Sequence, residues 1–153
     1  MKPFEPTKDG LVIEEPTTVI GGLPVSVLGM EESARMLVRM ALWARHHDVR
    51  PFYSTSANGQ VIALASEDEA FRELVKQADQ VHADGMPMVK LSGYVASDEI
   101  TERVATTDLI HAVARLAQKA GVSFYFLGAT PEVNRRSVSN MRWRYPKLIF
   151  AGA

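Results

Sequence analysis

Apolar residues recur along this sequence with a helical period in several segments. Between residues 31 and 45 they fall three and four positions apart, at Ala34, Leu37, Val38 and Ala41, which predicts an amphipathic helix. Similar spacing, with capping residues and stop signals, predicts four more helices. The first begins near Gln60, and the second begins at Ser66, an N-cap with Glu69 three residues later. The third begins at Thr106 or Thr107 and ends at Gly121. The fourth begins at Thr130 and ends near Tyr145.

Short β-prone runs separate the helical segments. They predict two strands around a Gly-Gly turn within residues 19–29, and further strands at 51–55, 79–84, 122–127 and 148–152. Strands that alternate with helices through short Gly-containing loops imply βαβ units. The sequence therefore predicts an α/β, Rossmann-like fold, with a largely parallel sheet covered by helices on both faces.

Proline and charge divide the chain into two parts. Residues 1–17 carry Pro3, Pro6 and Pro16 among charged residues, a composition typical of a flexible N-terminal arm. Residues 18–153 form a single predicted α/β domain. The sequence stops immediately after a predicted strand, where such a fold normally places a ligand loop, so we expect it to be the front part of a longer protein.

Composition excludes several classes of function. The 153 residues carry a formal net charge of -1, which argues against a nucleic-acid partner. The absence of cysteine excludes disulfides, thiolate metal sites and a cysteine nucleophile. The first residues lack a signal-peptide pattern, and no apolar run is long enough to span a membrane. We expect a soluble, cytoplasmic protein.

In open α/β sheets, ligands bind beyond the carboxyl ends of the strands, so the loops there are candidate sites. Ser56 and Asn58 follow the second predicted strand region, and their hydroxyl and amide groups can hold phosphate or sugar hydroxyls. Ordinary helix capping explains the same residues equally well.

The loop around His82-Ala83-Asp84-Gly85 is a second candidate. His82 and Asp84 share one face of a strand, and a carboxylate at a strand end suits a general base or a sugar ligand. Two alternatives remain open at this point: Asp79, His82 and Asp84 as metal ligands, or a simple Asp-Gly turn.

A third loop contains Gly128, Ala129 and Thr130 and precedes a helix, so its backbone N–H groups can bind phosphate. It matches neither a Walker A nor a dinucleotide-binding motif. Upstream, Arg103 can clamp a diphosphate with its fork of donors. Asp108 can either contact ligand or occupy the first turn of a helix.

Four motifs in register resemble one family. They are Ser56-Ala57-Asn58, Ala78 to Val89 with its Asp84-Gly85 pair, Glu102 to Leu109, and Phe124 to Pro131, followed by Arg144-Tyr145-Pro146. In order and content, over about residues 19 to 152, they resemble the WecG/TagA/CpsF family of bacterial glycosyltransferases, glycosyltransferase family 26.

The resemblance implies an enzyme that transfers N-acetylmannosamine or its uronic acid, with inversion, from a UDP-sugar to undecaprenyl-diphosphate-linked N-acetylglucosamine. It implies Asp84 as the general base, with Ser56, Asn58 and Arg103 as further site residues. From the residue arguments above we add Asp108 and the Gly128, Ala129, Thr130 loop as substrate-binding candidates. No metal or other cofactor is required by that scheme. It further implies action at the inner face of the cell membrane, and we expect association into a homo-oligomer.

Two departures from the family pattern stand out. Thr106 occupies a position where the family usually has glycine, and the family continues beyond the 148–152 strand into ligand-contacting and membrane-associating segments. A non-catalytic module that binds sugar nucleotides or assists assembly is therefore the alternative function.

Overall fold

The computed structural model describes residues 15–95 and 98–153. Most of the predicted N-terminal arm, and positions 96 and 97, lie outside the described residues. The described elements are strands β1 (Thr17–Ile20), β2 (Leu23–Ser26), β3 (Ser54–Ala57), β4 (Gln80–Ala83), β5 (Ser123–Tyr125) and β6 (Ile149–Gly152), with helices α1 (Met30–Ala44), α2 (Gly59–Glu67), α3 (Glu69–Lys76), α4 (Met86–Val95), α5 (Thr106–Ala120) and α6 (Pro131–Arg144).

The strands form three two-stranded sheets rather than the single, largely parallel sheet that the sequence predicts. β1 and β2 pair antiparallel, whereas β3 pairs with β4, and β5 with β6, in parallel. The antiparallel pair follows from its two-residue turn, where Gly21 and Gly22 both have positive φ, a backbone state that glycine adopts readily. The fold is mixed α/β, and the described residues do not join the pairs into one Rossmann-like sheet.

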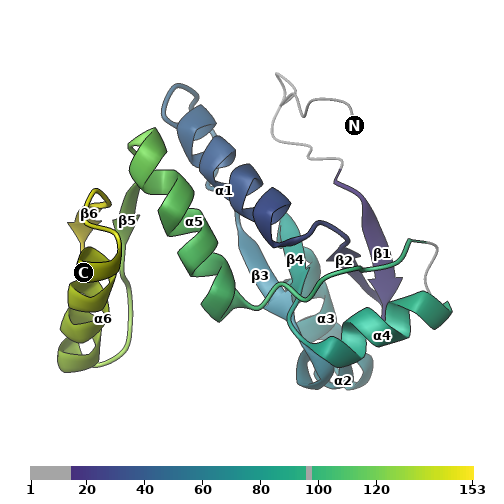
Figure 1. Cartoon of the computed structure of the whole chain (residues 1–153). Helices are drawn as coiled ribbons and strands as arrows, with labels where there is room; N and C mark the ends of the chain where they lie inside the picture. Colours follow the sequence, from purple (N-terminus) through teal and green to yellow (C-terminus); the bar gives the residue numbers. More distant parts are fainter. Residues whose placement is uncertain (1–14, 96–97) are drawn as a thin grey trace.

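Two apolar cores hold these elements. One gathers buried side chains from β1 to β4 with α2, α3 and α4, including Ile20, Leu23, Val81 and Met88. The other packs α1, α5 and α6 against β5 and β6. α1 and α5 lie side by side between the two parts (Figure 1), and a small cluster of Ala34, Val104 and Leu109 joins them near the start of α5.

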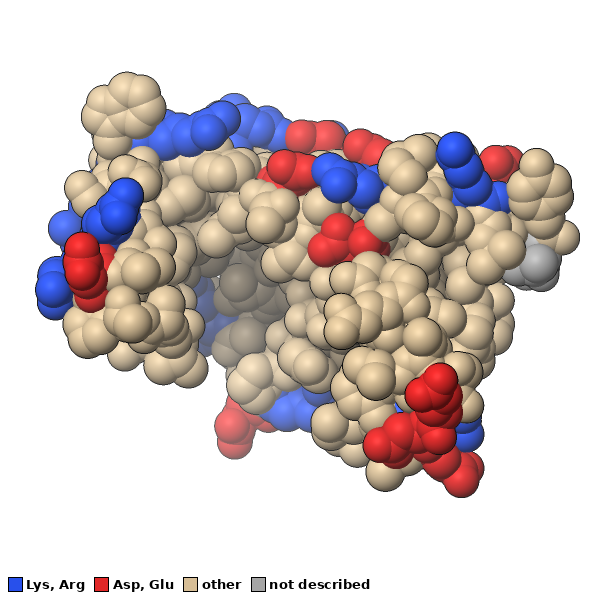
Figure 2. Space-filling view, turned by 90° about the horizontal axis from the view of Figure 1, so that it is seen from below, with Lys and Arg blue, Asp and Glu red and all other residues tan. Residues whose placement is uncertain are grey.

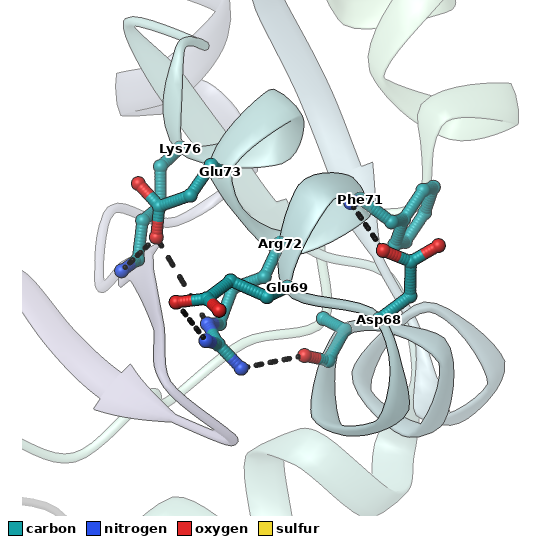
Figure 3. Close-up of polar contacts among 7 residues, drawn as sticks. Asp68, Glu69, Phe71, Arg72, Glu73 and Lys76 are labelled. Atoms are coloured by element: carbon teal, nitrogen blue, oxygen red, sulfur yellow. Dashed lines mark hydrogen bonds and ion pairs between the residues drawn. The ribbon is translucent and has the colours of Figure 1, made fainter.

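A polar network fixes α3 against α2 (Figure 3). Asp68 is the N-cap of α3 and accepts a hydrogen bond from the Phe71 N–H at 3.0 Å, so the predicted cap at Ser66 is wrong. Arg72 donates to the Ala65 carbonyl at 3.1 Å and pairs with Glu69 at 3.4 Å. Asp and Ser are equally favourable N-cap residues, and in the structure the N-cap is Asp68, two positions after Ser66.

Two strand boundaries differ from the sequence prediction for local reasons. β3 begins at Ser54 rather than at residue 51, because Asp79 holds the preceding backbone: its carboxylate pairs with Arg50 and accepts from the Tyr53 N–H at 2.7 Å. β5 ends at Tyr125 rather than at 127, and the chain then turns through positive φ at Gly128 and Ala129.

The ends of the last two long helices are partly as predicted. Gly121, with φ +67°, ends α5, and the Thr130 side chain caps α6 by accepting from the Val133 N–H, with Pro131 at the first position. The N-cap of α5 is Ala105, which has no capping side chain. The predicted cap at Thr106 or Thr107 is therefore wrong; both residues lie within the first turn.

Candidate functional site

The carboxyl ends of β3 and β4 bring the first two candidate loops together. The strands are parallel, with Ser56 opposite His82 and Ala57 opposite Ala83, so Asn58 and Asp84 are the next residues of neighbouring strands. The Asp84 N–H donates to the Ala57 carbonyl at 2.8 Å. The nearness of Asn58 and Asp84 is thus a direct consequence of the strand register.

The Asn58 side chain has a structural role in this arrangement. Its Oδ1 accepts hydrogen bonds from the N–H groups of Gln60 and Val61 at 3.0 and 3.1 Å, which caps α2. The side chain is exposed, and its amide NH₂ group donates no hydrogen bond to any described residue. Capping and ligand contact are therefore compatible at this residue, since they use different atoms.

Asp84 is half-buried at the end of β4. Among the described residues, its carboxylate makes no hydrogen bond or ion pair. Asp79, five residues earlier, is engaged by Arg50 and by the Tyr53 backbone. Of the two carboxylates in this loop, Asp84 is the one whose oxygens are available to a ligand.

His82 lies two residues before Asp84, in the interior of β4. It is only 2% exposed, and neither ring nitrogen has a hydrogen-bond partner among the described residues. Burial lowers the pKa of His82 to about 4, against a smaller opposing effect of the Asp84 charge. The imidazole is therefore neutral at physiological pH.

A metal site built from Asp79, His82 and Asp84 is not what the structure shows. Within residues 15–95 and 98–153, no group of three His, Cys, Asp or Glu residues has the arrangement to hold a metal ion. Asp79 is committed to Arg50, and His82 is buried.

Arg103 and Asp108 lie beside the same strand end. The Val104 N–H donates to the Ala83 carbonyl at 2.8 Å, so the segment that carries Arg103 runs past the end of β4. Arg103 Nη2 pairs with Asp108 Oδ2 at 2.8 Å, and both side chains are about half exposed. The pair uses one guanidinium nitrogen, and Asp108 takes the first-turn position in α5 that the sequence suggested as an alternative.

The Gly128, Ala129, Thr130 loop follows β5, in the β5–β6 sheet. It borders a shallow cavity of about 250 Å³ lined by Gly128, Ala129, Pro131, Asn134, Arg135 and Ala153. None of Ser56, Asn58, Asp84 and Arg103 lines that cavity. The structure therefore brings Ser56, Asn58, Asp84 and the Arg103 segment to one strand end and places the third loop in a separate depression.

Asn134 is a residue of this loop region that sequence reasoning missed. Its amide donates to the carbonyls of Phe126 and Gly128 at 3.2 and 3.1 Å, so it holds the loop in its bent form. An asparagine inside a helix carries no local signal for such a contact, because its partners lie in the preceding loop.

Parallel strands followed by polar loops, with a free carboxylate at one strand end, are the arrangement in which α/β proteins commonly bind ligands. A family comparison is more specific. Residues 18–153 match the model of the WecG/TagA/CpsF family of glycosyl transferases, and the chain belongs to this family.

Individual relatives agree with this assignment. The chain is similar to an N-acetylglucosaminyldiphosphoundecaprenol N-acetyl-beta-D-mannosaminyltransferase of Staphylococcus aureus strain MRSA252, at 24% identity over 131 residues. Its similarity to the protein of the same name from strain NCTC 8325 / PS 47 has the same extent. The match covers 83% of this chain and 51% of each relative, so the chain spans about half the length of these relatives.

No helix within the described residues is both long and apolar enough to cross a membrane.

Proposed function

We propose that the chain carries the catalytic loops of an inverting glycosyltransferase. The donor is a UDP-linked N-acetylhexosamine, N-acetylmannosamine or its uronic acid, and the acceptor is N-acetylglucosamine on undecaprenyl diphosphate. The acceptor class follows the names of the relatives. The observation that supports the proposal best is the free Asp84 carboxylate, held beside Asn58 by the pairing of β3 with β4.

In the proposed reaction, the Asp84 carboxylate accepts the proton of the acceptor hydroxyl. The resulting oxygen nucleophile attacks the anomeric carbon from the face opposite UDP. The bond to the UDP oxygen breaks, UDP leaves with the electron pair, and the configuration inverts. This chemistry needs a carboxylate within hydrogen-bond reach of the hydroxyl and does not itself require a metal.

The other loops bind and orient the substrates in this proposal. Ser56 and the free amide of Asn58 position sugar hydroxyls. Arg103, which uses one guanidinium nitrogen on Asp108, stabilises with its other donors the charge that develops on the diphosphate. The Gly128 to Thr130 loop borders a separate depression, where its backbone N–H groups can bind another anionic part of a substrate. A lipid-linked acceptor places the reaction at the cytoplasmic face of the membrane, with the protein bound peripherally.

The test compares UDP release by the chain and by Asp84→Asn. The substrates are a panel of UDP-N-acetylhexosamines and a short-chain diphosphate-linked N-acetylglucosamine. We expect the variant to lose roughly 10²- to 10⁴-fold in rate, the usual contribution of a general base. Asp48→Asn is the matched control, since Asp48 is exposed in the turn after α1 and should stay within about twofold of the parent.

Each other outcome has a definite meaning. Equal rates for the parent and Asp84→Asn would remove Asp84 as the base. A folded chain that binds UDP but releases none from any donor would favour the non-catalytic sugar-nucleotide-binding module.

A further inference from the structure

Helix α6 has an unusually one-sided charge. From Pro131 to Lys147 the sequence contains five cationic residues and one acid, Glu132. The cations are Arg135, Arg136, Arg142, Arg144 and Lys147. The whole chain has a net charge of -1, so the remainder of the molecule is net negative.

None of these five cations forms a salt bridge with a carboxylate in the described part of the chain. The described arginines elsewhere often do: Arg35, Arg50, Arg72, Arg103 and Arg115 all pair with Asp or Glu. The positive charge along α6 is therefore not neutralised within its own surface. Figure 2 shows blue side chains along the side of the molecule where Figure 1 places α6.

The helical period places these charges on the outward side of α6. Val138 and Met141 are buried, and Met141 belongs to the core that α6 shares with α1 and α5. Arg135 and Arg142, seven residues apart, form one stripe, and Arg136 and Trp143 form the neighbouring stripe. The Arg142 guanidinium lies 5.2 Å from the centre of the Phe150 ring, a cation–π contact that holds it at the edge of this face.

A large apolar side chain lies among these arginines. Trp143, near the C-terminal end of α6, is 86% exposed. An exposed Trp among arginines is typical of surfaces that lie in the headgroup region of a membrane, where the ring enters the interface and the cations meet anionic headgroups.

We propose that the outward face of α6, formed by Arg135, Arg136, Arg142, Trp143 and Arg144, docks on an anionic lipid surface. This proposal rests on the proposed function, since a membrane-embedded acceptor requires the protein to approach the bilayer. Charge complementarity selects the occupant: the four arginines of this face, none of which pairs with a described carboxylate, fit a layer of phosphate headgroups. It also predicts that the contact weakens as salt is added.

The experiment measures co-sedimentation of the chain with two kinds of vesicle. One contains phosphatidylcholine with about 30% of the anionic lipid phosphatidylglycerol, and the other contains phosphatidylcholine alone. We expect binding to the anionic vesicles only. The double variant Arg136→Gln/Arg144→Gln should bind roughly 25-fold more weakly, since each basic residue near such a surface contributes about fivefold. Both residues are exposed and line neither the Gly128 cavity nor the Asp84 loop.

A second variant makes the same change in net charge on another helix. Arg35→Gln/Arg39→Gln removes two exposed arginines from α1 and should bind within about threefold of the parent, because the lost charges lie outside the α6 face. The fluorescence of Trp143 should shift to the blue with anionic vesicles, and Trp143→Phe should lose that shift while Trp43 remains.

Several results would overturn the proposal. These are no binding of the parent chain to anionic vesicles, equal loss in the α1 and α6 double variants, or binding to single-stranded DNA with none to vesicles, which would indicate a nucleic-acid surface. The vesicles contain neither sugar donor nor acceptor. Failure of the glycosyltransferase proposal would therefore appear in the UDP-release experiment and leave this binding result unchanged.

Discussion

At the scale of single residues, Asn58 combines two roles that substitution can separate. Its Oδ1 caps α2 through two backbone N–H groups, while its amide nitrogen is free for a sugar hydroxyl. Asp has the same capping oxygen but no amide donor. The pair Asn58→Ala and Asn58→Asp therefore distinguishes a structural residue from a substrate-binding one.

We predict that Asn58→Ala lowers the free energy of unfolding by about 1 kcal/mol, the usual cost of losing an N-cap. Asn58→Asp should stay within about 0.5 kcal/mol of the parent in urea unfolding. In UDP-sugar binding, both variants should be weaker than the parent. Full binding by Asn58→Asp would assign the residue to capping alone.

Candidate residues were predicted from sequence with uneven success, for a physical reason. Asn58 and Asp84 both follow strands directly, and the carboxyl ends of paired parallel strands lie at the same edge of a sheet, so recognising the two strands was enough to expect both residues at that edge. The pairing of Arg103 with Asp108 and the role of Asn134 depend on how loops fold back. Nothing in residue spacing encodes such contacts, because loops have no period.

At the scale of elements, two glycines offer a controlled comparison. Gly21 turns β1 into β2 with φ +58°, and Gly121 ends α5 with φ +67°. A Cβ at Gly21 would lie 2.4 Å from the Ile62 Cγ2 atom, whereas a Cβ at Gly121 would meet nothing within 4 Å. The two positions share a backbone conformation and differ in the space around it.

Gly121→Ala should lower the free energy of unfolding by about 1 to 2 kcal/mol, the cost of the left-handed conformation for a residue with a Cβ. Gly21→Ala should cost roughly 1 to 3 kcal/mol more, because Ile62 must also move. Urea unfolding of both variants measures the difference. Gly21→Ala/Ile62→Ala should recover the clash component, and equal losses in the two single variants would contradict the predicted contact.

Helix positions were easier to predict from the sequence than the ends and the pairing of the strands. The 3.6-residue period located α1 and α5 well, because each buries one stripe against a core, and the Thr130-Pro131 start signal located α6. The ends of the strands were harder to predict. Residues 51–53 have β-prone side chains but lie before β3, because the Tyr53 backbone forms hydrogen bonds with Asp79 rather than with a neighbouring strand. The number of sheets was not predictable either, because strand pairing across the molecule leaves no local trace in the sequence.

At the scale of the whole molecule, the half-buried Glu15 and the buried His82 give stability opposite dependences on pH. Glu15 accepts a hydrogen bond from Gln80 at 2.8 Å, and burial raises the pKa of Glu15 to about 7 from 4.5. Burial lowers the pKa of His82 to about 4 from 6.5. Both residues are therefore held in the uncharged form.

The signs follow from proton binding. Between about pH 4.5 and 7 the folded state binds more protons at Glu15 than the unfolded state does, so this residue's contribution to stability falls as pH rises. Between about pH 4 and 6.5 the unfolded state binds more protons at His82, so that contribution falls as pH drops, by roughly 3 kcal/mol in total. Across pH 4.5 to 6.5 the two effects oppose each other.

We predict that Glu15→Gln and His82→Gln change the pH dependence of stability in opposite directions. Relative to the parent, Glu15→Gln should lose more stability on acidification from pH 6.5 to 4.5, whereas His82→Gln should lose less or gain. Urea unfolding at four pH values between 4.5 and 7.5 measures both. Parallel curves for the parent and the two variants would mean that neither side chain is held neutral by the fold.

The packing of α1 on α5 also has a consequence for how the chain is made. Glu31 on α1 pairs with Arg115 on α5, 84 residues later. At a synthesis rate of 5 to 20 residues per second, the apolar stripe of α1 waits roughly 4 to 17 seconds for its partner helix. During that interval the nascent chain exposes Leu37, Val38 and Leu42 to water, and this is the stage at which a chaperone that binds apolar segments would meet it.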